Sequence, residues 1–294
     1  LHELWTQAER GRGQVVGLVG EPGVGKSRLL YEFRHQVETG LEDTPRGQGV
    51  LLLDGRGLAY GSLTPYLPLL DLLKAYFQVG DRDVGTAIRA KVTRKLLALD
   101  KVLGSTLPAL LGLLEVPLED SQWQALEPPQ RRQRTLEGIK HLLLRESQIR
   151  PLLLVIDDLH WIDAETQALL DSLVESLPSA RLLLLLSYRP EYQHGWSNRT
   201  YYSQIRIDPL SPERAAVLLD ALLGPDTSLQ PLKARLIART EGNPFFLEES
   251  VQTLLETGVL VGERGAYRLP RALPTVRVPT TVQAVLAARI DRLP

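Results

Sequence analysis

The fold is decided by the stretch Val15-Val16-Gly17-Leu18-Val19-Gly20-Glu21-Pro22-Gly23-Val24-Gly25-Lys26-Ser27. Its apolar start, residues 15–19, predicts a buried β-strand, and residues 20–27 fit the pattern G-x-x-x-x-G-K-[ST]. The apolar residues Leu29, Leu30 and Phe33 predict that a helix follows at once. A strand, a glycine-rich turn and a helix in this order are the setting that a phosphate-binding loop requires.

The residue types of this loop suit a triphosphate. Backbone N–H groups can wrap phosphates only where no side chain blocks the approach and a positive φ is cheap, and Gly20, Gly23 and Gly25 meet that need. Because a helix N-terminus favours anions, we expect Lys26 to reach the β- and γ-phosphates and Ser27 to ligate Mg²⁺. The alternative is an ordinary glycine-rich turn, which matches this pattern by chance in only about 1% of chains of this length. The predicted nucleotide contacts here are Gly20, Glu21, Pro22, Gly23, Val24, Gly25, Lys26, Ser27 and Arg28.

The composition excludes several other classes of protein. The 294 residues carry a formal net charge of −1, which gives no electrostatic footprint for nucleic acid or an acidic membrane surface. The chain has no cysteine, so disulfides, thiolate metal sites and cysteine nucleophiles are excluded. Its apolar runs are far too short to span a bilayer, and no signal peptide precedes the first strand. We expect a cytoplasmic protein without a membrane or direct nucleic-acid partner, and we expect this chain to be a fragment of a longer one.

Two carboxylates follow a second apolar run. Residues 152–156 end in Asp157 and Asp158, which predicts a central parallel strand whose charged tip emerges at the carboxyl edge of a sheet. Given the phosphate loop upstream, Asp157 is predicted to hold the Mg²⁺ shell and Asp158 to orient the attacking water. The alternative interpretation is two acids that merely open a loop, and the presence of the phosphate loop makes it the weaker one.

The remaining elements complete an α/β pattern. Further strands are predicted at residues 50–54 and 204–208. Residues 181–190 predict another buried strand, with Ser187 and Arg189 at its carboxyl end. Between the strands at 50–54 and 152–156 the sequence predicts only helices, among them 84–99, 107–114 and 130–146, and these form a large helical insertion at residues 56–148. From residue 224 the pattern is mostly helical and includes a small hairpin built from residues 259–261 and 266–269.

Three features allow two interpretations from the residues alone. Arg189 follows a predicted strand and either senses the γ-phosphate or pairs with an acid such as Glu191. The arginines in residues 131–134 could form a polyanion site, but a solvated helix face is favoured because the opposite face is apolar. His160 either packs at the base of its loop or contacts the nucleotide, and packing is favoured because no nucleophile lies near it in sequence.

Four elements together resemble the STAND class of signal-transduction ATPases with numerous domains, a branch of the AAA+-like P-loop NTPases. The nearest likeness is to the ATPase module that follows class III adenylate/guanylate cyclase domains in many multidomain bacterial regulators. The phosphate loop alone marks only a superfamily, whereas Gly242-Asn243-Pro244 at this distance downstream is much more specific. The elements are residues 20–27, residues 152–158 with His160-Trp161-Ile162-Asp163, Ser187-Tyr188-Arg189-Pro190, and Glu241-Gly242-Asn243-Pro244-Phe245-Phe246-Leu247-Glu248-Glu249.

The resemblance implies a fold and several roles. The expected fold is an α/β P-loop NTPase three-layer sandwich with a parallel five-stranded sheet and the helical insertion, followed by an all-helical lid and the start of a winged-helix subdomain. The corresponding domains are 1–223, 224–257 and 258–294. By resemblance, Arg189 senses the γ-phosphate, Pro244 packs on adenine and residues 279–294 begin the winged helix. The family pattern has Glu where this chain has Asp158, which bears on the rate of hydrolysis.

These observations lead to one hypothesis and two alternatives. The hypothesis is a nucleotide-dependent switch of a larger bacterial regulator that binds ATP or ADP with Mg²⁺ and hydrolyses ATP slowly. The alternatives are a non-hydrolysing, nucleotide-stabilised platform for protein interaction and the ATPase module of a transcription activator. Besides nucleotide, the expected partners are other domains of the same chain and further copies of it in the ATP state. The predicted catalytic residues are Lys26, Asp158 and Arg189, and the predicted metal ligands are Ser27 and Asp157.

Overall fold

The computed structural model describes residues 1–40, 49–59, 65–118 and 120–270. Contacts among them divide the chain into two compact units. The first unit comprises Leu1–Val19 and Ser27–Ile205, and the second comprises Gly20–Lys26 and the chain from Arg206 onward. The phosphate loop of the sequence analysis is therefore grouped with the carboxyl-terminal part of the chain.

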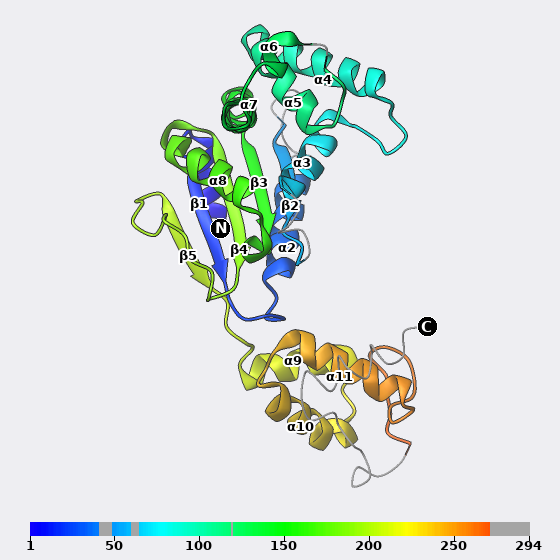
Figure 1. Cartoon of the computed structure of the whole chain (residues 1–294). Helices are drawn as coiled ribbons and strands as arrows, with labels where there is room; N and C mark the ends of the chain where they lie inside the picture. The colour runs from blue at the N-terminus through cyan, green and yellow to red at the C-terminus, as the bar shows by residue number, and fades with distance from the viewer. Residues whose placement is uncertain (41–48, 60–64, 119, 271–294) are drawn as a thin grey trace. The chain divides into compact units, whose positions relative to one another are not determined.

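A five-stranded sheet forms the centre of the first unit (Figure 1), in the order β2-β3-β4-β1-β5. The pairings β2 with β3, β3 with β4 and β1 with β4 are all parallel. The predicted α/β sheet is thus confirmed, although β5 begins and ends two residues earlier than expected, because the chain joins the second unit from Arg206 onward. The strands are β1 (Gln14–Val19), β2 (Leu51–Arg56), β3 (Leu152–Asp157), β4 (Leu182–Tyr188) and β5 (Tyr202–Arg206).

Helices cover both faces of this sheet. Alternate residues of β1 point to opposite sides, as the period of two in a strand requires. Val16 packs in one apolar cluster with residues of α1 (His2–Glu9) and α2 (Lys26–Thr39), while Val15 packs in another with α7 (Pro128–Ile149) and α8 (Ala164–Ser176). The predicted three-layer sandwich is confirmed, and every residue of β4 is buried between the two helical layers.

The predicted helical insertion separates β2 from β3 in the sequence. Figure 1 shows α4, α5 and α6 grouped together within it. The exposed arginines of residues 131–134 bond to groups of the same chain. Arg132 pairs with Glu165 at 2.6 Å, and Arg131 donates to the Leu126 carbonyl at 2.8 Å. Their exposure agrees with the interpretation of a solvated helix face. Besides α7, the described residues of the insertion form α3 (Leu67–Phe77), α4 (Gly85–Leu99), α5 (Leu107–Leu113), α6 (Ser121–Gln124) and the 3₁₀ turn Lys101–Thr106.

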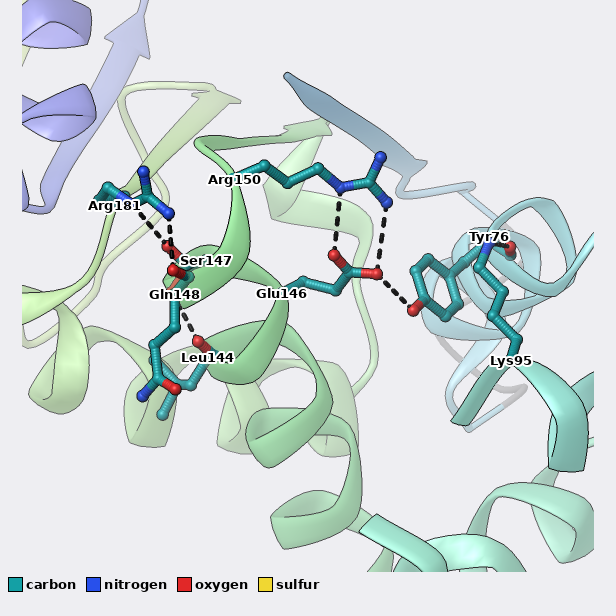
Figure 2. A network of polar contacts seen from close by, with 8 residues as sticks. All are labelled: Tyr76, Lys95, Leu144, Glu146, Ser147, Gln148, Arg150 and Arg181. Atoms are coloured by element: carbon teal, nitrogen blue, oxygen red, sulfur yellow. Dashed lines mark hydrogen bonds and ion pairs between the residues drawn. The ribbon is translucent and has the colours of Figure 1, made fainter. Parts of the chain in front are cut away.

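A buried carboxylate ties the insertion together (Figure 2). Glu146 of α7 is 3% exposed, and it accepts hydrogen bonds from the Tyr76 hydroxyl and from Arg150 Nε at 3.1 Å. Lys95 of α4 donates to the Tyr76 carbonyl, and its ammonium lies 3.8 Å from the centre of the Tyr76 ring. Burial raises the pKa of Tyr76 and lowers that of Lys95. The carboxylate thus supplies the acceptor for the buried Tyr76 hydroxyl and for the partly exposed Arg150 guanidinium.

We expect Glu146→Ala to lower the free energy of unfolding of the first unit by about 3 kcal/mol, because it leaves the Tyr76 hydroxyl and the Arg150 guanidinium without their acceptor. All four tryptophans of the chain lie in this unit, so urea unfolding followed by tryptophan fluorescence measures the change. Glu137→Ala, an exposed change on the same helix, is the control and is expected to stay within about 0.5 kcal/mol. A Glu146 variant as stable as this control would show that the network contributes nothing net.

An aromatic cluster surrounds His194 after β4. Its Nε2 lies 2.9 Å from the Tyr188 hydroxyl and 3.1 Å from the Tyr202 hydroxyl, while its Nδ1 accepts from the Trp196 N–H at 3.2 Å. The same hydroxyls explain Gly17 in the neighbouring strand, because a Cβ there would lie 2.7 Å from each of them. Burial lowers the pKa of His194 below its usual 6.5, opposed by the charge of Asp171. The neutral ring is therefore the form that the fold prefers.

The sign of the resulting pH effect follows from this shift. An unfolded His194 takes up a proton near pH 6.5 and the folded one only at lower pH, so the unfolded state binds more protons as the pH falls below 6.5. As the pH is lowered from 6.5, we expect the unfolding free energy of the wild type to decrease more steeply than that of His194→Gln. Above pH 7 we expect the two free energies to change with pH in the same way. Urea unfolding at a series of pH values measures both. Parallel curves throughout would contradict the role of His194.

Up to residue 270, where the description ends, the core of the second unit is formed by the helices α9 (Pro212–Leu223), α10 (Gln230–Thr240) and α11 (Pro244–Glu256). Leu219, Leu236 and Leu247, one from each helix, are fully buried in a single apolar cluster. The predicted hairpin is present as one antiparallel bridge between Val261 and Arg268. Because α9 packs with α10 and α11, it groups with the lid here, whereas the sequence analysis put it in domain 1–223. The division into 1–223, 224–257 and 258–294 stays a prediction, and the expected winged helix lies outside the described residues.

Candidate nucleotide-binding site

The phosphate loop leads directly from β1 into α2. Gly23 has φ 82° and Gly25 has φ 102°, a left-handed conformation that glycine adopts without strain. The helix begins at Lys26, so its first backbone N–H groups have no partner within the helix and are available to an anion. A turn with two left-handed glycines at a helix N-terminus fits the phosphates of a nucleotide, as the sequence analysis expects.

Lys26 is 7% exposed and its ammonium is held by the loop itself. Its Nζ donates to the carbonyl of Gly20 at 2.6 Å and to that of Glu21 at 2.9 Å. A buried ammonium needs such acceptors, and a phosphate oxygen is a stronger acceptor than a peptide carbonyl. The chemistry of this arrangement therefore suits an exchange in which phosphate takes over one of the carbonyl contacts.

Residues at the start of α11, in the same unit as the loop, contact two of its carbonyls. Asn243, directly before α11, donates from Nδ2 to the Pro22 carbonyl at 2.9 Å, and the Phe245 N–H donates to the Gly23 carbonyl at 3.2 Å. The sequence analysis gave a role to Pro244 but none to Asn243. From its position directly before a helix that begins with Pro, Asn243 is expected to cap that helix. The structure shows instead that its side chain makes no capping hydrogen bond, so sequence position alone did not reveal its contact with the loop.

The carboxyl ends of β3 and β4 bring Asp157 together with Ser187. The Ser187 hydroxyl is fully buried and donates to Asp157 Oδ1, which also accepts from the Asp158 N–H at 3.1 Å. The Asp158 N–H lies 3.0 Å from Ser187 Oγ as well. These contacts fix the orientation of the Asp157 carboxylate at the strand end. Sequence analysis placed Ser187 at this edge without assigning it a partner.

Asp158 adopts a left-handed backbone conformation, with φ 55° and ψ 47°. This conformation is uncommon outside glycine and concentrates at functional sites. The Asp158 carboxylate accepts from Arg56, at the end of β2, with Nη2 at 3.1 Å and Nε at 3.3 Å from Oδ2. Arg56 is a second residue that sequence reasoning missed, since it lies 102 positions away from its partner.

Arg189 lies just beyond the end of β4 and against Trp161. Its guanidinium carbon is 5.4 Å from the centre of the Trp161 ring. The distance from Arg189 Nη1 to Glu191 Oε1 is 3.9 Å. The ion pair with Glu191 is weak at this distance, and the Trp161 ring stabilises the Arg189 charge through a cation–π interaction. The His160 ring lies 5.2 Å from that of Trp161, in keeping with the packing interpretation. The γ-phosphate role of Arg189 stays a prediction.

The donor set suits magnesium held partly by phosphate. Within the described residues no group of three or more His, Cys, Asp and Glu side chains could hold a metal by itself. Mg²⁺ bound with a nucleotide needs only one or two protein oxygens besides phosphate and water. The Ser27 hydroxyl and the Asp157 carboxylate carry oxygens of that chemical type, and their role as metal ligands stays a prediction. None of the helices in the described part of the chain has the length and apolar character needed to cross a membrane.

Comparison with known families decides the broader class. Residues 1–186 match the family described as the AAA ATPase domain. The chain belongs to the AAA ATPase domain family. This AAA ATPase domain is 26% identical over 298 residues to an uncharacterized protein of Rhizobium meliloti (strain 1021). The match covers 99% of the chain and 27% of that relative.

Solved structures similar to this AAA ATPase domain share little sequence with it. A Signal Transduction ATPase with Numerous Domains carrying a tetratricopeptide repeat sensor, from Pyrococcus horikoshii, is 14% identical with a TM-score of 0.40, over 100% of this chain and 32% of that one. A chain of Drosophila ORC bound to DNA is 13% identical with a TM-score of 0.39, over 87% and 55%. PCH-2 of C. elegans is 12% identical with a TM-score of 0.35, over 80% and 46%.

Proposed function

We propose that this AAA ATPase domain is an ATP-binding, slowly hydrolysing switch module of a larger bacterial regulatory protein of the cytoplasm. The observation that carries the proposal is the loop of residues 20–26, with two left-handed glycines and a buried Lys26 at a helix N-terminus. Family membership supports ATP as the nucleotide. The match to 27% of a longer relative supports a module within a larger protein, and the association with cyclases rests on the motif resemblance alone.

The proposed roles divide the nucleotide among the named residues. Loop N–H groups and Lys26 bind the phosphates, Ser27 and Asp157 hold Mg²⁺, and Pro244 packs on adenine. Asp158 orients the attacking water, and Arg189 stabilises the charge of the γ-phosphate. Bound Mg²⁺ would neutralise charge that develops on the phosphate oxygens.

Slow hydrolysis has a specific structural support. The Asp158 carboxylate is engaged by two nitrogens of Arg56, so its Oδ2 is already an acceptor before any water arrives. A carboxylate committed to an ion pair orients water less effectively than one that accepts from water alone. The same observation favours the second candidate, a nucleotide-stabilised interaction platform that does not turn ATP over.

The test is to purify the protein without added nucleotide, denature it and identify by chromatography what it carried. Binding of MgATP and release of phosphate over several turnovers are then measured on the native protein. Bound ADP or ATP, tight MgATP binding and slow multiple turnover are the expected results. Tight binding without turnover would establish the platform instead. A protein that carries no nucleotide and binds no MgATP would overturn both.

A further inference from the structure

Two adjacent carbonyls of the phosphate loop are held by the N-terminal turn of α11. Asn243 Nδ2 donates to the Pro22 carbonyl at 2.9 Å, and the Phe245 N–H donates to the Gly23 carbonyl at 3.2 Å. The approach is close, since a Cβ on Gly23 would lie 2.7 Å from Asn243 Oδ1. A contact between residues 221 positions apart thus fixes two successive peptide groups.

Peptide geometry gives these contacts a consequence for phosphate binding. In a planar trans peptide the C=O and N–H bonds point in opposite directions. The Pro22 carbonyl belongs to the peptide of the Gly23 N–H, and the Gly23 carbonyl to that of the Val24 N–H. Because both carbonyls point toward α11, both N–H groups point away from it. Backbone N–H groups of such a loop are the donors that bind phosphate.

The Asn243 side chain donates to the loop while its own carbonyl oxygen, Oδ1, is buried without a donor among the described residues. It is 7% exposed, and its Oδ1 accepts no hydrogen bond in the part of the chain that the structure describes. A residue selected only to fill this space would leave no buried acceptor unsatisfied. Among the described residues, the hydrogen bond that the Asn243 side-chain amide makes is the one that its Nδ2 donates to the loop.

We propose that Asn243 is a positioning residue for the phosphates: through the Pro22 carbonyl it aims the loop N–H groups at the bound polyphosphate. The proposal rests on the nucleotide-binding function proposed above. It assigns the residue to the phosphate part of the ligand and not to the base. Changes at Asn243 should therefore act alike on every ligand with the same phosphate chain.

The experiment measures dissociation constants for MgATP, MgGTP and magnesium tripolyphosphate in the wild type and in Asn243→Leu. Leucine keeps the side-chain volume and removes both polar atoms, including the unsatisfied Oδ1. The expected result is about tenfold weaker binding of all three ligands, which corresponds to one hydrogen bond, with an unchanged ratio between them. The thermal midpoint of the nucleotide-free protein is expected to stay within about 2 °C, because the lost donor and the lost orphan acceptor offset each other.

The matched control is Asn198→Ala, an exposed asparagine of the first unit, which should leave all three constants unchanged. A loss of affinity accompanied by an equal loss of stability would reduce Asn243 to a structural residue and overturn the proposal. Unchanged affinity would overturn it as well, and so would a loss confined to MgATP, because that pattern would place Asn243 at the base.

Hydrogen–deuterium exchange of the nucleotide-free protein separates this proposal from the proposed function. If Asn243 orients the loop, Asn243→Leu should exchange the amides of residues 23–25 several-fold faster than the wild type, whatever the protein binds. Faster exchange in a protein that fails to bind MgATP would leave the orienting contact established and overturn the function. Equal exchange rates would overturn the orienting contact itself.

Discussion

Lys26→Ala is expected to weaken the binding of MgATP by about 100-fold or more. The ammonium is the only side-chain cation within the loop of residues 20–26, and its loss removes charge-assisted hydrogen bonds to phosphate, each equivalent to about tenfold or more in affinity. Isothermal titration calorimetry of the wild type and the variant with MgATP measures the change in affinity. Retained tight binding would contradict the assignment of this loop to phosphate.

Two measurements guard this result against a folding defect. Lys101→Ala removes an exposed lysine from the insertion and should bind MgATP as the wild type does. Because Lys26 also bonds the carbonyls of Gly20 and Glu21 in the second unit, while all four tryptophans lie in the first, the unfolding of the variant should be followed by far-UV circular dichroism and recorded beside its affinity. An unchanged unfolding transition with lost binding assigns the effect to the site.

Asp158→Ala is expected to reduce phosphate release by about 100-fold while MgATP affinity changes by less than about threefold. A group that orients or activates the attacking water contributes on the order of 10² to 10⁴ to the rate and little to ground-state binding. A coupled assay for phosphate and a titration with MgATP measure the two quantities separately. Undiminished turnover in the variant would remove Asp158 from the mechanism.

A second aspartate supplies the control for the lost ion pair. Asp54 of β2 pairs with Arg34 at 2.9 Å, and its side chain is 56% exposed. Asp54→Ala also deletes an Asp–Arg pair, but one that includes neither Asp158 nor Arg56, so turnover should be unchanged. If both variants lost turnover equally, the effect of Asp158→Ala would come from general disturbance of the sheet.

Local pattern was enough to predict most of the fold. Residues 152–156 and 182–186 are continuous apolar runs, a pattern typical of strands buried on both faces. The edge strand β5 has no such run, and its limits were wrong by two residues because the chain leaves the sheet at Arg206 for the other unit. Local sequence carries no signal for that boundary.

The polar partners of the site could not be predicted in the same way. Ser187 was visible at a strand end, but its bond to Asp157 depends on β3 and β4 being neighbours. The contacts Arg56 to Asp158 and Asn243 to Pro22 join residues 102 and 221 positions apart. A single sequence shows which residue types are present but not which distant residues contact each other. These partners could therefore be identified only from the structure.

The strand order also determines when the protein can fold. β1 is made first, yet its residue Gln14 pairs with Leu183, and β2 pairs with β3 only after the whole insertion has been synthesised. The central β4 supplies partners to both β1 and β3, so the sheet cannot close until it leaves the ribosome. Long loops must be closed before these pairings stabilise anything, which slows folding and leaves apolar segments open to chaperones or aggregation. Truncation before residue 182 should therefore yield a chain without a stable sheet, even though the whole phosphate loop is present.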